Sequence, residues 1–306
     1  MDALVDAIVN AIVNVGERKG AEMKEVKRVV LFANSTKASV DGLVEDMCSF
    51  FEARDIQTCV LHLSSTNDDS NIDVPDADLA ISLGGDGTVL TCAAALKGRD
   101  IPIMAVNLGT FGYITETSAY EYKDVFEDYV GGRTCVLERM MLHAKVLRGG
   151  HEVFSSTALN DMTVCACAMS KLVNIRLKID GVLAADLKAD GLIVATPTGS
   201  TAYSLAAGGP ILDASLNAII VNPICPFAMS VRPLVVSDSS VLTLEVPSQR
   251  TSIAISSDGH EMFELMEGDV VVIERSPCNA LFVANRRRNF IEVLRDKLGW
   301  AEAFNA

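Results

Sequence analysis

The first part of the chain alternates between short apolar runs and longer segments in which apolar residues recur at helical spacing. The apolar runs of strand length span residues 29–33, 59–63, 79–83 and 101–106. Apolar positions at helical spacing span residues 2–15, 40–51 and 89–97. Strands that alternate with helices in this way form parallel sheets whose faces are covered by the helices. This part of the chain therefore predicts an α/β domain built on a parallel, doubly wound sheet.

The pattern changes near residue 134. Runs rich in Val, Ile and Leu then follow one another over residues 135–194 and 219–273, separated by turn signals such as Asp180-Gly181. These runs predict short strands in a second, mainly antiparallel and β-rich domain. Helical spacing returns over residues 289–300.

These changes of pattern set the expected domain boundaries. We expect an α/β domain over residues 1–140, a β-rich domain over residues 141–275 and a C-terminal segment over residues 276–306. The helix of the C-terminal segment places Phe290 and Leu294 on one face, and we expect it to return and pack on the first domain.

The composition excludes several classes of protein. The 306 residues are 49% hydrophobic with a formal net charge of −14, which argues against nucleic acid or an anionic membrane as a partner. No apolar run reaches the length of a membrane span and no signal-peptide layout is present, so we expect a cytoplasmic protein. The eight cysteines lack zinc-type spacing and predict buried, reduced thiols.

The most informative stretch directly follows the apolar run 79–83. It consists of Gly84, Gly85, Asp86, Gly87 and Thr88. A glycine turn between a strand and a helix offers free N–H groups and the positive end of the helix to a phosphate. A carboxylate in the middle of such a turn repels a bare phosphate, so Asp86 is expected either to hold a magnesium ion or to receive the proton of an attacking hydroxyl. The alternative is an ordinary turn, because Asp-Gly is common in turns.

A second strand, turn and helix are expected over residues 190–203. Small hydroxyl-bearing residues gather there, namely Thr196, Thr198, Ser200 and Thr201. Such a run presents hydroxyls and backbone amides to an anion or a sugar, although it also fits an ordinary helix cap. Tyr203 at its end either stacks on a base or fills the core.

Several motifs, taken in order, make the chain resemble the NAD kinases. They are Gly84-Gly-Asp-Gly-Thr88, Asn160-Asp161, the stretch from Asp190 to Tyr203 with Gly208-Gly-Pro210, Pro226 with Ser230, Arg232-Pro-Leu-Val-Val236, Ser257-Asp-Gly259 and Leu294-Arg-Asp-Lys-Leu-Gly-Trp300. Lipid kinases and phosphofructokinases share Gly-Gly-Asp-Gly alone. The resemblance spans residues 29–300 and implies a Rossmann-like α/β first domain followed by a β-rich, NAD-binding domain.

The resemblance also implies an activity and a set of site residues. ATP would give its terminal phosphate to the 2′-hydroxyl of the adenosine ribose of NAD, with a divalent metal such as Mg²⁺, and Asp86 beside Gly87 would accept the proton. The matching NAD contacts are Asn160, Asp161, Lys171, Lys188 and Asp190. The matching adenine and ribose pocket comprises Thr201, Ala202, Tyr203, Ser204, Leu205 and Ala206, with Thr198 as a further substrate contact. His260 stands where glutamine is common and is either a contact or a solvated turn residue.

Four positions depart from the family pattern. Asp161 replaces a glutamate, Ala206 a serine, Phe227 a histidine and Thr91 an arginine. These changes bear on affinity and on the choice of phosphoryl donor more than on the reaction. The alternatives to an NAD kinase are a lipid kinase that shares the glycine loop and a non-catalytic NAD(P)-binding sensor. A homodimer or homotetramer is expected from the resemblance and from the high apolar content.

Overall fold

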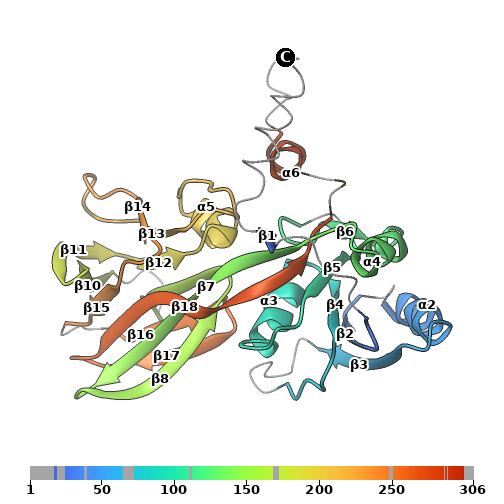
Figure 1. Cartoon of the computed structure of the whole chain (residues 1–306). Coiled ribbons are helices and arrows are strands. Elements are labelled where there is room, and N and C mark those ends of the chain that lie inside the picture. Colours follow the sequence, from blue (N-terminus) through green and yellow to red (C-terminus); the bar gives the residue numbers. More distant parts are fainter. Residues whose placement is uncertain are drawn as a thin grey trace. The chain divides into compact units, whose positions relative to one another are not determined.

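The structure is a computed structural model that describes residues 17–18, 25–37, 40–64, 72–109, 112–167, 172–247, 251–285, 287 and 289–299. The helix expected at 2–15 lies outside these residues, as do Lys171 and Trp300. The chain divides into two compact units, Met1–Glu138 with Ala280–Ala306, and Arg139–Asn279 (Figure 1). The long strands β7 (Val136–Arg148) and β18 (Val270–Val283) each begin in one unit and end in the other.

The first unit is built on a parallel sheet. Besides parts of β7 and β18, the first unit contains β1 (Glu17–Arg18), β2 (Arg28–Asn34), α2 (Val40–Glu52), β3 (Gln57–Leu63), β4 (Leu79–Gly84), α3 (Asp86–Ala95), β5 (Ile103–Asn107), β6 (Thr117–Ser118), α4 (Tyr122–Val130) and α6 (Phe290–Leu298). Strands β3, β2, β4 and β5 pair in this order, all parallel, and β6 and the end of β18 pair with β5 in the same direction. The predicted α/β class is confirmed.

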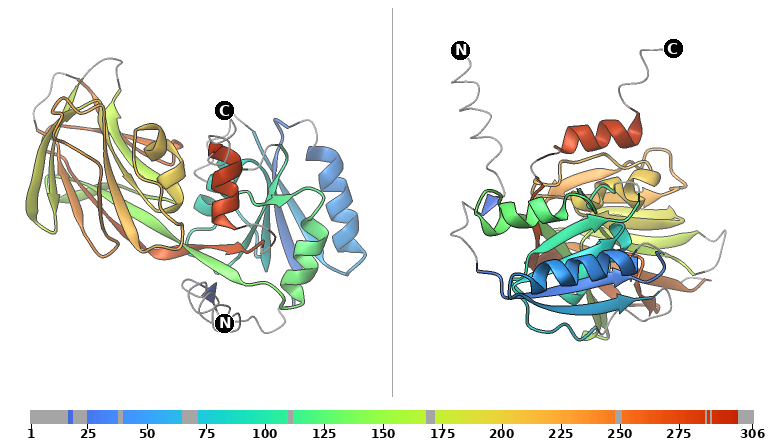
Figure 2. Two further views of the ribbon diagram at one scale, coloured as in Figure 1. Left: turned by 90° about the horizontal axis from the view of Figure 1, so that it is seen from above. Right: turned by 90° about the vertical axis from the view of Figure 1, so that its right-hand side faces the viewer.

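The central strands of this sheet are buried on both faces. Leu31, Ile81 and Met104 share a core with apolar residues of α2 and α4. Their neighbours Phe32 and Ser82 point to the opposite face and are also buried. Helix α3 packs against β4 and β2, and Figure 2 shows helices on both sides of this sheet. Burial on both faces explains why these strands are continuous apolar runs rather than alternating ones.

The C-terminal helix α6 has a clear start and end. Asn289 Oδ1 accepts the backbone N–H of Glu292 at 2.9 Å, and Glu292 Oε2 accepts the backbone N–H of Asn289 at 3.0 Å. This reciprocal pair is a capping box, and Gly299 ends the helix in the left-handed conformation. Leu294 is the residue of α6 that is buried in the first unit.

The second unit is made of antiparallel strands. They are β8 (His151–Ala158), β9 (Asp161–Ala166), β10 (Val173–Ile179), β11 (Val182–Ala189), β12 (Gly191–Ala195), β13 (Ala218–Ile224), β14 (Leu234–Ser237), β15 (Leu242–Glu245), β16 (Ile253–Ser257) and β17 (Glu261–Leu265), with a 3-10 turn at Thr198–Thr201 and helix α5 at Tyr203–Ala206. Among the described residues, six strands form a sheet in the order β14-β13-β12-β9-β16-β17. Its inner residues, such as Val164 and Ile255, share a core with Leu177 and Leu244 of the neighbouring sheet. The predicted β-rich class is confirmed.

Two expectations for the chain need correction. The strands that border the second unit are not short, since β7 has 13 residues and β18 has 14. The cysteines are unpaired, but Cys59, Cys167 and Cys225 are exposed rather than buried.

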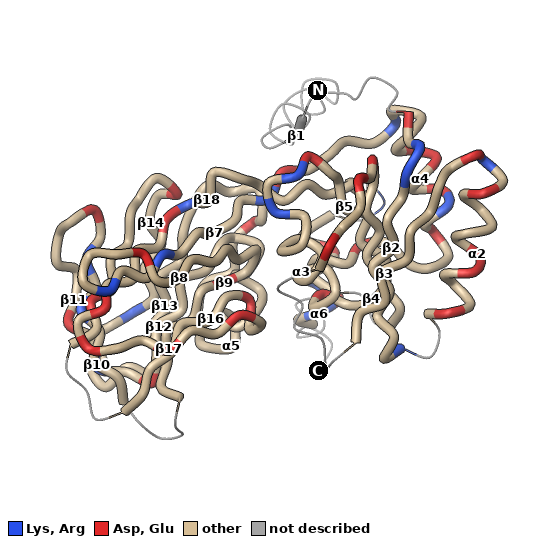
Figure 3. Tube along the Cα trace, turned by 90° about the horizontal axis from the view of Figure 1, so that it is seen from below, with Lys and Arg blue, Asp and Glu red and all other residues tan. Residues whose placement is uncertain are grey.

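Helix α2 carries acidic but no basic positions (Figure 3). Within the described part of the chain, no helix has both the length and the apolar character needed to cross a membrane.

Candidate active site

Strand β4 ends in a position that only glycine can occupy. A Cβ at Gly84 would lie 2.1 Å from Thr88 Oγ1, because the chain turns back tightly into α3. The same oxygen accepts a hydrogen bond from Asn34 Nδ2 at 3.2 Å, which joins the carboxyl ends of β4 and β2. These parallel strand ends form the edge at which open α/β sheets bind ligands.

Helix α3 begins at Asp86 itself, with Gly85 as its N-cap. The expectation that Asp86 lies in the middle of the turn was therefore wrong. Gly87 is exposed, and a Cβ at Gly85 or Gly87 would meet no atom within 4 Å. The first N–H groups of a helix have no partner within it, so this end of α3 can receive an anion.

The Asp86 carboxylate is held by the loop that follows β5. Its Oδ2 accepts the backbone N–H of Tyr113 at 2.9 Å. Its Oδ1 accepts the backbone N–H groups of Ile114 at 3.3 Å and Thr115 at 3.1 Å, and the Thr115 hydroxyl at 3.0 Å. Four donors thus fix the carboxylate at the end of β4. The motifs of the sequence did not single out this segment.

Gly112 makes this contact possible, and replacing it by alanine is expected to displace Asp86. A Cβ at position 112 would lie 1.8 Å from Asp86 Oδ1. Overpacking of this kind costs about 1–3 kcal/mol. We expect Gly112→Ala to lower both the melting temperature and turnover, the latter by about tenfold.

The matched control is Gly42→Ala on the exposed face of α2. A Cβ there meets no atom within 4 Å, and alanine is a better helix former than glycine. Thermal melts and initial rates of the two variants test the contact. Wild-type values in Gly112→Ala would contradict the described position of Asp86.

In the second unit, Asn160 and Asp161 lie at the start of β9 on a turn held by Asp258. The Asp258 carboxylate accepts the backbone N–H groups of Leu159 at 2.7 Å, Asn160 at 2.8 Å and Asp161 at 3.0 Å. Asp258 itself occupies the left-handed region, with φ of 50°, in the turn between β16 and β17. The cap of this turn is therefore Asp258, a role that its motif did not reveal.

Asp161, which is buried, and Asp258, which is part-buried, are neighbouring acids. Burial is the main cause that raises the pKa of Asp161 to about 6, and the charge of Asp258 adds to the rise. The Thr163 hydroxyl, 3.1 Å from Asp161 Oδ1, opposes it. Burial also raises the pKa of Asp258 to about 6, against the three N–H groups that it accepts. Carboxylates with raised pKa values in a polar pocket are typical of functional sites.

The hydroxyl-rich stretch after β12 differs from the helix expected there. It forms a 3-10 turn followed by a helix of only 4 residues. The Thr196 hydroxyl donates to the Leu159 carbonyl at 2.6 Å, and a Cβ at Gly199 would lie 2.1 Å from the Asn160 carbonyl oxygen. Much of this stretch therefore supports the turn that carries Asn160.

Other polar atoms of this region are left for a ligand. Asn160 Oδ1 and Thr198 Oγ1 are buried and have no hydrogen-bond partner in the described structure. Unsatisfied buried polar atoms are rare in proteins, and a substrate is one explanation for them. Tyr203 is 49% exposed. Burial raises its pKa, and the charges of Asp161 and Asp190 are among the causes that add to the rise.

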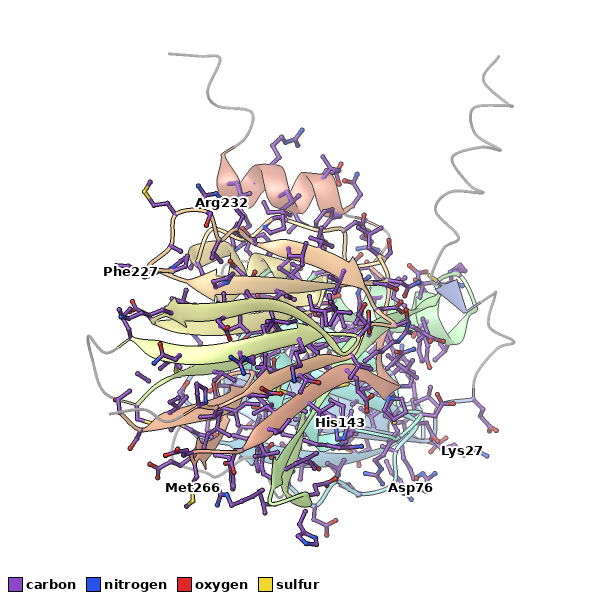
Figure 4. The ribbon with its side chains drawn as sticks, turned by 90° about the vertical axis from the view of Figure 1, so that its left-hand side faces the viewer. Lys27, Asp76, His143, Phe227, Arg232 and Met266 are labelled. Carbon is purple, nitrogen blue, oxygen red and sulfur yellow. The ribbon has the colours of Figure 1, made fainter. Side chains whose placement is uncertain are left out.

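The remaining predicted residues lie at different places in the second unit. Lys188 and Asp190 are exposed, and the Lys188 ammonium lies 5.4 Å from the ring centroid of Phe227. Phe227 is 72% exposed and points outward from the unit (Figure 4). His260 is exposed in the turn after Asp258. Thr201, Ala202 and Leu205 are half-buried, Ser204 is buried and Ala206 is exposed.

Ser204 serves the fold. Asn222 Nδ2 donates to its carbonyl at 2.9 Å and to its hydroxyl at 3.3 Å. In the first unit, Thr91 is buried in α3. The sequence singled out Asp86, Asn160 and Thr198, but not Gly112, Thr115 or the role of Asp258.

Comparisons with known proteins give consistent matches. Residues 14–134 match the ATP-NAD kinase N-terminal domain, and residues 159–285 match the ATP-NAD kinase C-terminal domain. The NAD kinase of Geobacter sulfurreducens is 38% identical over 283 residues, which cover 90% of this chain and 100% of that protein. The NAD kinase of Geotalea daltonii is 35% identical over 283 residues, which likewise cover 90% of this chain and 100% of that protein.

Solved structures show the same fold. An NAD kinase from Archaeoglobus fulgidus in complex with ATP matches with a TM-score of 0.69 and 25% identity, covering 89% of this chain and 97% of that one. Yeast NADH kinase complexed with NADH matches with a TM-score of 0.80 and 24% identity, covering 92% and 88%.

Proposed function

The chain belongs to the NAD kinase family, and from this premise we propose that it transfers the terminal phosphate of ATP to the 2′-hydroxyl of the adenosine ribose of NAD, giving NADP. The observation that carries the proposal is the Asp86 carboxylate, held by four hydrogen bonds at the end of β4 and the start of α3. Membership in this family leaves no reason to keep the lipid-kinase alternative.

Asp86 is assigned as the proton acceptor. Phosphoryl transfer passes through a loose transition state, so positioning of the hydroxyl and neutralisation of charge matter more than the strength of the base. A carboxylate with a fixed orientation suits this task, because it accepts the ribose proton without moving. The free N–H groups at the start of α3 support binding of the phosphates beside it.

A protein-held metal is not supported by the residues present. Within the described residues, no three side chains of His, Cys, Asp or Glu come together as a cation site. Magnesium keeps several of its waters and is often bound through substrate phosphates. We therefore propose that the divalent metal enters with ATP and neutralises phosphate charge, while Asp86 keeps the proton-accepting role.

NAD is proposed to bind residues of the second unit. Asn160 and Thr198 supply buried oxygens without partners, Asp161 supplies a carboxylate, and Tyr203 supplies a half-exposed ring on which a base can stack. Lys188, Asp190 and His260 are exposed, and they are further NAD contacts that the resemblance assigns. The cytoplasm, which holds NAD and ATP together, is the proposed location.

The test is an assay of NADP formation from NAD, ATP and Mg²⁺, run beside a titration of NAD binding. Turnover that requires all three components supports the kinase. Binding of NAD without turnover would favour the sensor alternative. The absence of both NAD binding and turnover would overturn the proposal.

We also propose that the chain forms a homodimer or homotetramer. Strand β14 lies at the edge of the described six-stranded sheet, and its Leu234 and Val235 are exposed. Phe227 and Met229, earlier in the same segment, are 72% and 85% exposed. Apolar side chains on an unpaired edge require a covering partner. Light scattering is expected to give a mass at least twice the 32.7 kDa of one chain, and a monomer at micromolar concentration would contradict this.

A further inference from the structure

We propose that Thr115 is a positioning residue for phosphoryl transfer, and that Asn107 orients it so that only one oxygen of Asp86 is left to receive the ribose proton. The inference rests on the assignment of Asp86 as the proton acceptor. It concerns residues that neither the motifs nor the comparisons single out.

The Thr115 hydroxyl has one proton to donate and two lone pairs to accept with. Asn107 Nδ2 donates to it at 2.9 Å, and the backbone N–H of Gly112 donates to it at 2.9 Å. Both neighbours are donors, so they occupy the lone pairs and cannot accept. The single hydroxyl proton is therefore directed to Asp86 Oδ1, 3.0 Å away.

The orientation of the Asn107 amide is itself fixed. Its Oδ1 accepts the backbone N–H of Gly109 at 2.6 Å, which leaves Nδ2 facing Thr115. Asn107 is the last residue of β5 and is 5% exposed, and Thr115 is fully buried. Burial of both side chains keeps solvent from the relay of hydrogen bonds that runs from Asn107 through Thr115 to Asp86. A buried polar network whose hydrogen bonds are all made holds a single arrangement.

The relay makes the two oxygens of Asp86 unequal. Oδ1 accepts three hydrogen bonds, from Ile114, from the Thr115 backbone and from the Thr115 hydroxyl. Oδ2 accepts one from described residues, the backbone N–H of Tyr113. A carboxylate oxygen accepts about two hydrogen bonds, so Oδ2 retains the capacity to accept the proton. As the ribose oxygen attacks phosphorus, its proton moves to Oδ2, and the phosphoryl group leaves ADP.

The test uses Thr115→Val and Thr115→Ser in the full-length protein. Valine has a similar shape but no hydroxyl, so Asp86 loses one hydrogen bond and the amide groups of Asn107 and Gly112 lose their acceptor. We expect kcat to fall about tenfold or more, with the Michaelis constant for NAD changed less than threefold, because the ribose-binding residues lie elsewhere. Serine keeps the hydroxyl and is expected to restore most of kcat.

The matched control is Thr58→Val on β3. Among the described residues, the Thr58 hydroxyl is buried and has no hydrogen-bond partner, so its removal is expected to leave both kcat and thermal stability near wild type. Melting temperatures of all variants, measured alongside, identify any loss that comes from unfolding.

The outcomes separate this inference from the proposed function. Inactive Asp86→Asn together with fully active Thr115→Val would overturn the role of Thr115 and leave the proposed function standing. Active Asp86→Asn would overturn the assignment of Asp86 and, with it, this inference. If Thr115→Ser fails to restore kcat although it is folded, the hydroxyl is not the group that matters, and the inference is also overturned.

Discussion

Replacing Asp86 by asparagine is expected to lower turnover by about 10²- to 10⁴-fold while NAD binding changes by no more than a few-fold. The amide oxygen can take the place of Oδ1 and accept the same three donors. The amide nitrogen then takes the place of Oδ2, where it meets the N–H of Tyr113 and cannot receive a proton. The substitution thus removes the acceptor oxygen and keeps most of the local structure.

A conservative control for this variant is Asp55→Asn. Asp55 is exposed and has a positive φ of 58°, a conformation that asparagine also adopts. Its turnover should equal that of the wild type. Single-turnover rates and NAD titrations on both variants give the result, and turnover of Asp86→Asn near the wild-type value would reject Asp86 as the catalytic group.

Replacing Asp161 by alanine is expected to weaken NAD binding by about ten- to hundredfold. A carboxylate that accepts hydrogen bonds from a buried substrate contributes roughly 1.5–3 kcal/mol, and each 1.4 kcal/mol is a factor of ten. Asp161 is 6% exposed, and among the described residues its carboxylate accepts a hydrogen bond from the Thr163 hydroxyl, at Oδ1. Its Oδ2 is therefore available to ribose hydroxyls or to an adenine amine.

The Asp161→Glu variant distinguishes a direct contact of Asp161 with NAD from a structural role of this residue. Asp161→Glu supplies the family's residue, and we expect its NAD binding to stay within a few-fold of wild type. The turn at residues 159–161 is held by Asp258, so loss of the Asp161 side chain should not undo it. An unchanged Michaelis constant for NAD in Asp161→Ala would remove this residue from the site.

The raised pKa of Asp161 gives binding and stability opposite pH dependences. Its value of about 6 in the folded chain exceeds the ordinary 3.8, so protonation favours the folded state. This contribution to the unfolding free energy is present below the unfolded pKa and is lost as pH rises through about 6. NAD binding needs the charged form and should weaken as pH falls through the same range.

Asp161→Asn is expected to show both effects together. At pH 8 it should melt a few degrees above the wild type, because the buried charge of Asp161 and its repulsion with Asp258 are removed, and bind NAD less tightly. Its NAD affinity should depend less on pH near 6 than that of the wild type, since only Asp258, whose pKa is also about 6, still titrates there. Melting curves and NAD-binding titrations between pH 5 and 8, where both proteins are folded, test the opposite pH dependences of stability and of NAD binding.

The sequence alone determined the order and type of the main elements. Apolar runs of strand length at 29–33 and 79–83 became β2 and β4, because strands buried on both faces need apolar residues at every position. Glycines 84 and 85 marked the turn into α3, and Pro197 with Gly199 marked the turn after β12. These are local features, so a local pattern is sufficient to predict them.

Only the tertiary structure decided how the site residues are held. Asp86 is fixed by donors 27 to 29 residues further along the chain, and the turn at Asn160 is fixed by Asp258, 97 to 99 residues away. Most of these donors are backbone N–H groups, which nearly every residue carries, so the identity of Tyr113 or Leu159 gives no sign of the bond. Residue type reveals which carboxylates carry chemistry, whereas the pairing of distant loops decides which backbone atoms orient them.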